Sequence, residues 1–347
     1  VMHAASRALA AGAGFRLVGP DEMQLDVDVP VVAVDAVRTG CGKSQLSRAL
    51  TDELQTRGYE VGVVREPMPY GDLATNRVQR FESMADLDAA GVTVEEREEY
   101  EQHIERDHTV YAGVDYEAIL ARASDENDLV LWDGGNNELP FVRPDAHVVL
   151  ADPLRPGDTD TYHPGEANLR SADAVVVNKE NAASDDQVSE TVRRIRDANP
   201  DAPVYHADSV VSVDDPSLVR DASVLVVEDG PTLTHGDAAY GAGTVAAEQY
   251  GAADRLDPRE AAVGSIADVL DEYDHLDRVL PAMGYSDAQL ADLEATIDAV
   301  DPDAVVAGTP VALDRLVDVD APVVDVSYHI ELHDTTPGEL LDAALDL

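Results

Sequence analysis

Short apolar runs alternate along the chain with longer segments that carry the pattern of amphipathic helices. Residues 31–37 and 61–64 are valine-rich and largely apolar, which is typical of strands buried in a parallel sheet. Residues 44–57 have a helical pattern that ends at Gly58. The alternation predicts an α/β fold with a mostly parallel, doubly wound sheet and flanking helices. Further strands are expected at residues 15–18, 129–132, 146–150, 174–177, 204–205, 223–227, 304–307 and 323–326, and further helices at residues 1–11, 95–106 and 187–198.

A glycine-containing loop follows the first apolar run. Residues 31–44 read VVAVDAVRTGCGKS, so a strand leads into the loop and GKS opens a helix, which is the setting of a phosphate loop. The backbone amides of residues 40–44 would surround the β-phosphate, and the glycines permit that close approach. Lys43 would reach the β- and γ-phosphates, and the Ser44 hydroxyl would bind Mg²⁺. Val37 replaces the first glycine of the pattern. The residues expected to contact a nucleotide here are Arg38, Thr39, Gly40, Cys41, Gly42, Lys43, Ser44 and Gln45.

Two further residues of this loop have open roles. In deviant phosphate loops a signature lysine stands at the position of Arg38, and a guanidinium there would stabilise the transferring phosphoryl group. Such an arginine acting across subunits would require a homodimer. A surface salt bridge is the alternative role of Arg38. Cys41 is interpreted as a small loop residue rather than a nucleophile.

The second chemical motif is LVLWDGGNN, residues 129–137. Asp133 falls at the carboxyl end of an apolar strand, where ligands bind in open α/β sheets, and it is the expected Mg²⁺-binding and catalytic aspartate. The two glycines after it leave room for a γ-phosphate. Asn136 and Asn137 are candidates to orient water or the acceptor, with helix capping as the alternative.

A third motif, VVVNKEN, occupies residues 175–181. It resembles the NKxD motif with which GTPases read guanine, so Asn178, Lys179 and Asn181 are expected to bind the base. Asn181 replaces the aspartate of that motif, and an amide lacks the charge and the paired oxygens that guanine contacts use. The sequence therefore leaves ATP and GTP open as the nucleotide.

The charge balance narrows the choice of partners. The chain has 70 acidic and 24 basic residues and a net charge of −46, which excludes a nucleic-acid footprint and disfavours anionic membranes. No apolar run is long enough to span a bilayer, and the single cysteine fits a reducing cytoplasm. Lys43 and Lys179 are the only lysines, against 22 arginines. This composition predicts a protein of a halophile, because molar salt would screen the repulsion.

Eight segments resemble the cyclic 2,3-diphosphoglycerate synthetase-related family of P-loop NTPases, which are also described as predicted GTPases. The resemblance implies an ATP- and Mg²⁺-dependent enzyme that closes a phosphoanhydride, and a further α/β domain before this sequence. Residues 1–24 are accordingly expected to be the tail of that domain, although a natural start is the alternative. Residues 25–205 would form the nucleotide-binding core, and residues 206–347 a C-terminal α/β extension packed on it. The segments are GCGKS (40–44), REPMPYGDL (65–73), YAGVDYEAIL (111–120), LWDGGNN (131–137), DPLRPGD (152–158), YHPGEANLRSAD (162–173), EDGPTLTHG (228–236) and LPAMGYSDAQ (280–289).

The loops in these segments supply candidates for the acceptor site. A small phosphorylated acid needs converging arginines, so Arg65, Arg155 and Arg170 are expected to bind it, together with Asp72 and the two asparagines of the second motif. Neutralisation of neighbouring carboxylates is the alternative role of each arginine. The predicted function is Mg²⁺-dependent nucleoside triphosphate hydrolysis that drives phosphoryl transfer or phosphoanhydride formation. The alternative is a regulatory GTPase switch with a protein partner.

Overall fold

The protein forms two compact units, each built from separate stretches of the chain. In the computed structural model, unit 1 contains Val1–Arg80, His108–Asp208 and Glu331–Leu347, and unit 2 contains Phe81–Asp107 and Ser209–Ile330. The expected core boundary at residue 205 lies close to the observed boundary at Asp208, but unit 2 also takes residues 81–107 and unit 1 takes the C-terminal segment. The structure describes residues 1–66, 68, 72–135, 138–229, 233, 240–276, 278–282, 286–309, 313 and 317–345.

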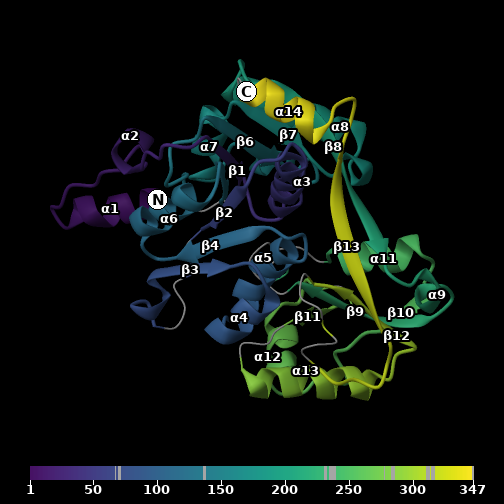
Figure 1. Ribbon diagram of the computed structural model, residues 1–347. Coiled ribbons are helices and arrows are strands. Elements are labelled where there is room, and N and C mark those ends of the chain that lie inside the picture. Colours follow the sequence, from purple (N-terminus) through teal and green to yellow (C-terminus); the bar gives the residue numbers. More distant parts are fainter. Residues whose placement is uncertain are drawn as a thin grey trace. The chain divides into compact units, whose positions relative to one another are not determined.

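The sheet of unit 1 has the strand order β8-β7-β6-β1-β5-β2-β4-β3, and all of these strands except β5 are labelled in Figure 1. Strand β1 lies between β5 and β6 and is parallel to both. Strands β1, β2, β5, β6 and β7 are buried along their whole length, as the largely apolar runs predicted. The strands are β1 (Val31–Ala36), β2 (Val61–Arg65), β3 (Val78–Phe81), β4 (Thr109–Gly113), β5 (Leu129–Asp133), β6 (Ala146–Ala151), β7 (Ala174–Val177) and β8 (Val204–Val213).

Helices flank this sheet, and α3 is the one that the phosphate-loop motif opens. Leu46, Leu50 and Leu54 recur every four residues on α3 and are fully buried, so one face of the helix faces the core. Helix α14 packs on α3, where Arg57 Nη1 lies 2.5 Å from Asp342 Oδ1 (Figure 1). The helices of unit 1 are α1 (Met2–Ala10), α2 (Pro20–Met23), α3 (Lys43–Thr56), α6 (Tyr116–Glu126), α7 (Gly165–Ser171), α8 (Asp185–Ala198) and α14 (Pro337–Ala344), with single 3₁₀ turns η1 (Thr75–Arg77), η2 (Pro156–Asp158) and η3 (Glu180–Ala182).

The first residues follow the prediction only in part. The expected helix at residues 1–11 is present as α1, but the expected strand at residues 15–18 is not formed. In this part of the described chain the sheet-like contact is a single bridge between Leu25 and Val142. A strand needs a neighbour to satisfy its backbone hydrogen bonds, and residues 15–18 have no described ladder partner.

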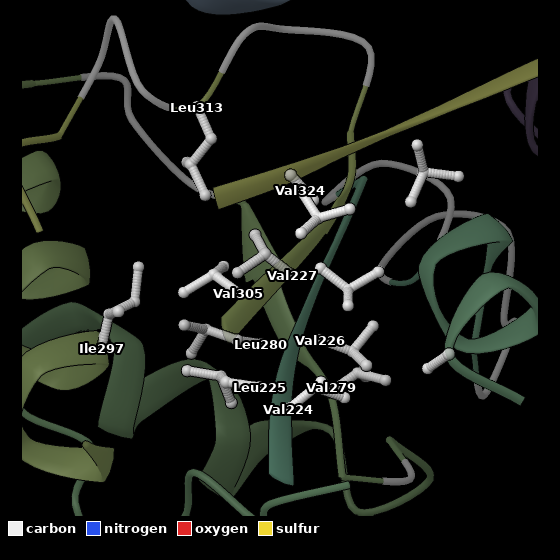
Figure 2. Packing of buried hydrophobic residues seen from close by; sticks show 14 of the residues in the cluster. Val224, Leu225, Val226, Val227, Val279, Leu280, Ile297, Val305, Leu313 and Val324 are labelled. Atoms are coloured by element: carbon white, nitrogen blue, oxygen red, sulfur yellow. The ribbon is translucent and has the colours of Figure 1, made fainter. Parts of the chain in front are cut away.

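Unit 2 is a second parallel α/β structure. Its strand order is β10-β9-β12-β13, and β11 also pairs with β9. Figure 2 shows its core, in which Val224–Val227 of β9 pack beside Leu280, Val305 and Val324. Its strands are β9 (Ser223–Asp229), β10 (Asp254–Arg255), β11 (Leu280–Ala282), β12 (Ala304–Gly308) and β13 (Val323–Leu332), and its helices are α4 (Met84–Ala90), α5 (Val94–Ile104), α9 (Pro216–Val219), α11 (Ala242–Gln249), α12 (Gly264–Glu272) and α13 (Asp287–Val300).

None of the described helices is both long and apolar enough to cross a bilayer.

Candidate nucleotide-binding site

The loop between β1 and α3 has the backbone geometry that a phosphate loop requires. Gly40 and Gly42 have φ values of +85° and +94°, a region that L side chains rarely adopt. A Cβ at Gly42 would lie 2.1 Å from Asn178 Nδ2, so only glycine fits. Asn178 Nδ2 donates a hydrogen bond to the Cys41 carbonyl at 3.0 Å. The third motif therefore braces the phosphate loop from the end of β7.

Lys43 and Asp133 meet where α3 begins and β5 ends. Lys43 Nζ lies 2.9 Å from Asp133 Oδ1, and Ser47 Oγ donates to the same oxygen at 2.6 Å. Asp133 is fully buried. Sequence reasoning missed Ser47, which lies on α3 one turn after Lys43 and so presents its hydroxyl on the same helix face. The two motifs thus converge on one carboxylate.

Arg65 completes the surroundings of Asp133. Its Nη1 lies 2.5 Å from Asp133 Oδ2 and donates to the Asp133 carbonyl at 2.9 Å. The Arg65 side chain is fully buried. The structure thus places this expected acceptor residue against the aspartate, joining the ends of β2 and β5. Two cations then face one buried carboxylate, which offsets the cost of removing its charge from water.

The donor set fits Mg²⁺. Ser44 stands in the first turn of α3, and Asp133 supplies a carboxylate at the end of β5. Magnesium prefers oxygen ligands and usually keeps several waters, with one or two carboxylates and substrate phosphates as its other ligands. Within the described residues, no three His, Cys, Asp or Glu side chains are grouped to hold a metal. Ser44 and Asp133 would therefore hold Mg²⁺ together with a nucleotide.

Arg38 and Arg155 border the phosphate loop. Arg38 forms an ion pair with Asp158 of η2 and lies over the Tyr162 ring, 4.5 Å from its centroid. Arg155 Nη2 donates to the Thr39 carbonyl at 2.8 Å and to Asp152 Oδ2 at 3.1 Å. Each arginine is thus held by a carboxylate while its charge stays beside the loop.

The third motif, VVVNKEN, lies next to Asp152, the carboxylate that Arg155 contacts. Lys179 has a left-handed backbone with φ of +64°, and its Nζ lies 3.8 Å from Asp152 Oδ2. Asn181 is exposed, in η3. Burial is the main cause that raises the pKa of Cys41 to about 12, with the Asp152 charge adding to it. The thiol stays protonated at neutral pH, in agreement with a packing role rather than a nucleophilic one.

The remaining predicted residues are placed elsewhere. Asp72 is exposed and accepts from the Ala74 backbone amide at 3.0 Å, so it caps the turn that leads into η1. Arg170 pairs with Glu166 on its own helix at 2.7 Å and donates to the Ala198 carbonyl. Its described contacts thus belong to α7 and α8. Asn136 and Asn137 lie outside the described residues.

Sequence reasoning overlooked a buried carboxylate in β1. Asp35 is fully buried, and its Oδ2 lies 2.9 Å from His147 Nε2 of β6. An aspartate inside the otherwise apolar run VVAVDA was the available signal, because buried carboxylates are rare unless they are paired or functional. Glu66 and Glu138 near it were overlooked as well.

Two known proteins are similar to this chain over most of its length. The chain is 54% identical over 331 residues to the arginine synthetase ArcE of Thermococcus kodakarensis, covering 95% of this chain and 74% of ArcE. The solved structure of LpxK from Aquifex aeolicus in complex with ATP is similar with a TM-score of 0.51 and 14% identity, over 92% of this chain and 89% of LpxK. No family model matches the chain. The likeness to LpxK concerns the fold, in which the phosphate loop joins β1 to α3.

Proposed function

The chain belongs to the family of the arginine synthetase ArcE, and from this we propose that it is a nucleoside triphosphate-dependent synthetase whose product is arginine. The observation that carries the proposal is the meeting of Lys43 and Asp133 at 2.9 Å beside a phosphate loop with two left-handed glycines. This arrangement suits phosphoryl transfer, because it places a cation and a metal-binding carboxylate at one strand end.

Phosphoryl transfer has a clear use in making arginine. The oxygen of a neutral ureido group is a poor leaving group, and attack of that oxygen on the γ-phosphorus would convert it into a phosphate ester with release of nucleoside diphosphate. Ammonia would then add to the activated carbon. Inorganic phosphate would leave with the oxygen, and the product would be the guanidinium.

The residues of the site in unit 1 have different roles in this phosphoryl transfer. The amides of the phosphate loop and Lys43 bind the β- and γ-phosphates, and Arg38 and Arg155 add positive charge at the loop's border. Arg65 contacts Oδ2 of the Asp133 carboxylate, whereas Lys43 contacts Oδ1, and so holds the group in place. Bound Mg²⁺ would neutralise phosphate charge as the phosphoryl group transfers.

A single assay separates this function from its alternatives. Nucleotide consumption and arginine formation are measured with MgATP or MgGTP, L-citrulline and ammonium, and in parallel with 2,3-diphosphoglycerate as the acceptor. We expect arginine and nucleoside diphosphate in equal amounts, and no product from Lys43→Ala. Arg193→Ala is the matched control, because that cation pairs with surface carboxylates of α8. Turnover with 2,3-diphosphoglycerate alone would favour the phosphorylated-acid acceptor. Slow hydrolysis that no acceptor changes would favour the GTPase switch.

A further inference from the structure

Three carboxylates approach the two glycines that follow β5. Asp35 comes from β1, Glu66 directly follows β2, and Glu138 lies five residues beyond Asp133; we call these three the acidic cluster. A Cβ added at Gly135 would lie 2.2 Å from Glu66 Oε2 and 2.9 Å from Glu138 Oε1. A Cβ at Gly134 would lie 2.2 Å from Asp35 Oδ1. Any side chain at these positions would fill the space between the carboxylates.

Negative charge exceeds positive charge around this cluster. Burial raises the pKa of Glu138 well above its usual range, and the charge of Glu66, a hydrogen bond to Glu66 and the charge of Asp35 raise it further. Arg65 Nη2 lies 3.8 Å from Glu66 Oε1, and the His147 ring lies 2.9 Å from Asp35. Arg65 also forms an ion pair with Asp133, so its single positive charge is shared between two carboxylates. The cluster therefore favours a further cation.

A separate observation points to a ligand at the same place. Asp35 is fully buried, and among the described residues its Oδ1 has no hydrogen-bond partner. The buried indole Nε1 of Trp132 also has no partner in the described part of the chain, and it would lie 2.2 Å from a Cβ at Gly134. An acceptor and a donor are thus both left open beside one glycine. Buried polar groups are nearly always satisfied, so the open Asp35 oxygen indicates a missing hydrogen-bond donor.

We propose that the acidic cluster binds the cationic nitrogen group of the substrate or product, a guanidinium or an ammonium. The inference rests on the proposed arginine synthesis. Both cations offer several N–H donors and no acceptor, which matches the carboxylates and the open Asp35 oxygen. Lys43 contacts Asp133, and Arg65 contacts both Asp133 and Glu66. The nitrogen cation would therefore lie at the same sheet edge as the phosphates.

The test is calorimetric binding of L-arginine and of L-citrulline, whose ureido group is the neutral counterpart of guanidinium. Wild type is compared with Asp35→Asn and Glu138→Gln, and with the control Asp160→Asn, which removes a carboxylate that pairs with Arg194. We expect at least a tenfold loss of arginine affinity in both cluster variants, and unchanged binding of citrulline and MgATP. A raised half-saturating ammonium concentration with unchanged arginine affinity would identify ammonium as the bound cation and equally support the site.

Two outcomes would overturn the inference. If wild type forms arginine and both cluster variants match it in arginine affinity and ammonium dependence, the cluster holds only water. If both variants lose MgATP binding and recover it at high Mg²⁺, the cluster binds the metal instead. A folded wild type that neither forms nor binds arginine would refute the proposed function itself. Where Asp35→Asn does not fold, Glu138→Gln carries the test. Glu138 lies in a loop and is partly exposed, so its substitution disturbs the fold less than that of the fully buried Asp35.

Discussion

Replacement of Arg65 by alanine is expected to destabilise unit 1 strongly. The side chains of Arg65 and Asp133 are both fully buried, and the guanidinium contacts the carboxylate at 2.5 Å and the carbonyl at 2.9 Å. Breaking a buried ion pair by removing one partner costs about 3–5 kcal/mol. Lys43 and Ser47 remain on Asp133, so we expect the lower end, about 3 kcal/mol. For a domain of this size that lowers Tm by roughly 6–12 °C.

The single tryptophan makes this measurable. Trp132 precedes Asp133 in β5 and is fully buried, so its fluorescence reports the unfolding of unit 1. Arg170→Ala is the matched control. Its side chain is 53% exposed, and such pairs contribute about 0–1 kcal/mol. Adding Asp133→Asn to Arg65→Ala should recover part of the loss. The deficit should persist in molar KCl, because buried pairs are screened little. Equal Tm shifts for Arg65→Ala and Arg170→Ala would refute this reasoning.

Three further expectations concern the loop and the acidic cluster. Lys43→Ala should weaken MgATP or MgGTP binding at least about 100-fold in calorimetry, since a charge-assisted phosphate contact is lost; unchanged affinity would contradict the site. Gly42→Ala should destabilise unit 1 and abolish nucleotide binding, because φ is +94° and the added Cβ meets Asn178 at 2.1 Å; a normal Tm would contradict the geometry. A cation favours the ionised form of Glu138, whose pKa is raised, so arginine binding should release protons and strengthen from about pH 6 to 8. Glu138→Gln should flatten this dependence, and a pH-independent wild type would contradict it.

Local patterns predicted the centre of unit 1 well. The valine-rich run and the GKS sequence place β1, the phosphate loop and α3 within a residue or two of where the structure has them. Such elements are set by neighbours in the sequence, through burial period and glycine geometry. The position of Asp133 at a strand end followed from the same reasoning.

Local sequence patterns could not predict contacts between residues that are far apart in the chain. The partner of Arg65 is 68 residues away, so the sequence could mark the arginine as important without identifying its role. The inclusion of residues 81–107 in unit 2 depends on packing against segments that follow residue 208. Asp35 was the exception, since an acidic residue in an apolar strand is visible without a structure.

Because α14 packs on α3, the two units become complete in a definite order while the ribosome makes the chain. A ribosome releases β1, the phosphate loop and α3 early, but Asp342, which pairs with Arg57 at the end of α3, emerges 285 residues later. The stretches of unit 2 end at Ile330, before this helix. The later-starting unit is therefore complete in the nascent chain first, and the nucleotide-binding unit gains its last cover only when residues 337–344 have left the exit tunnel.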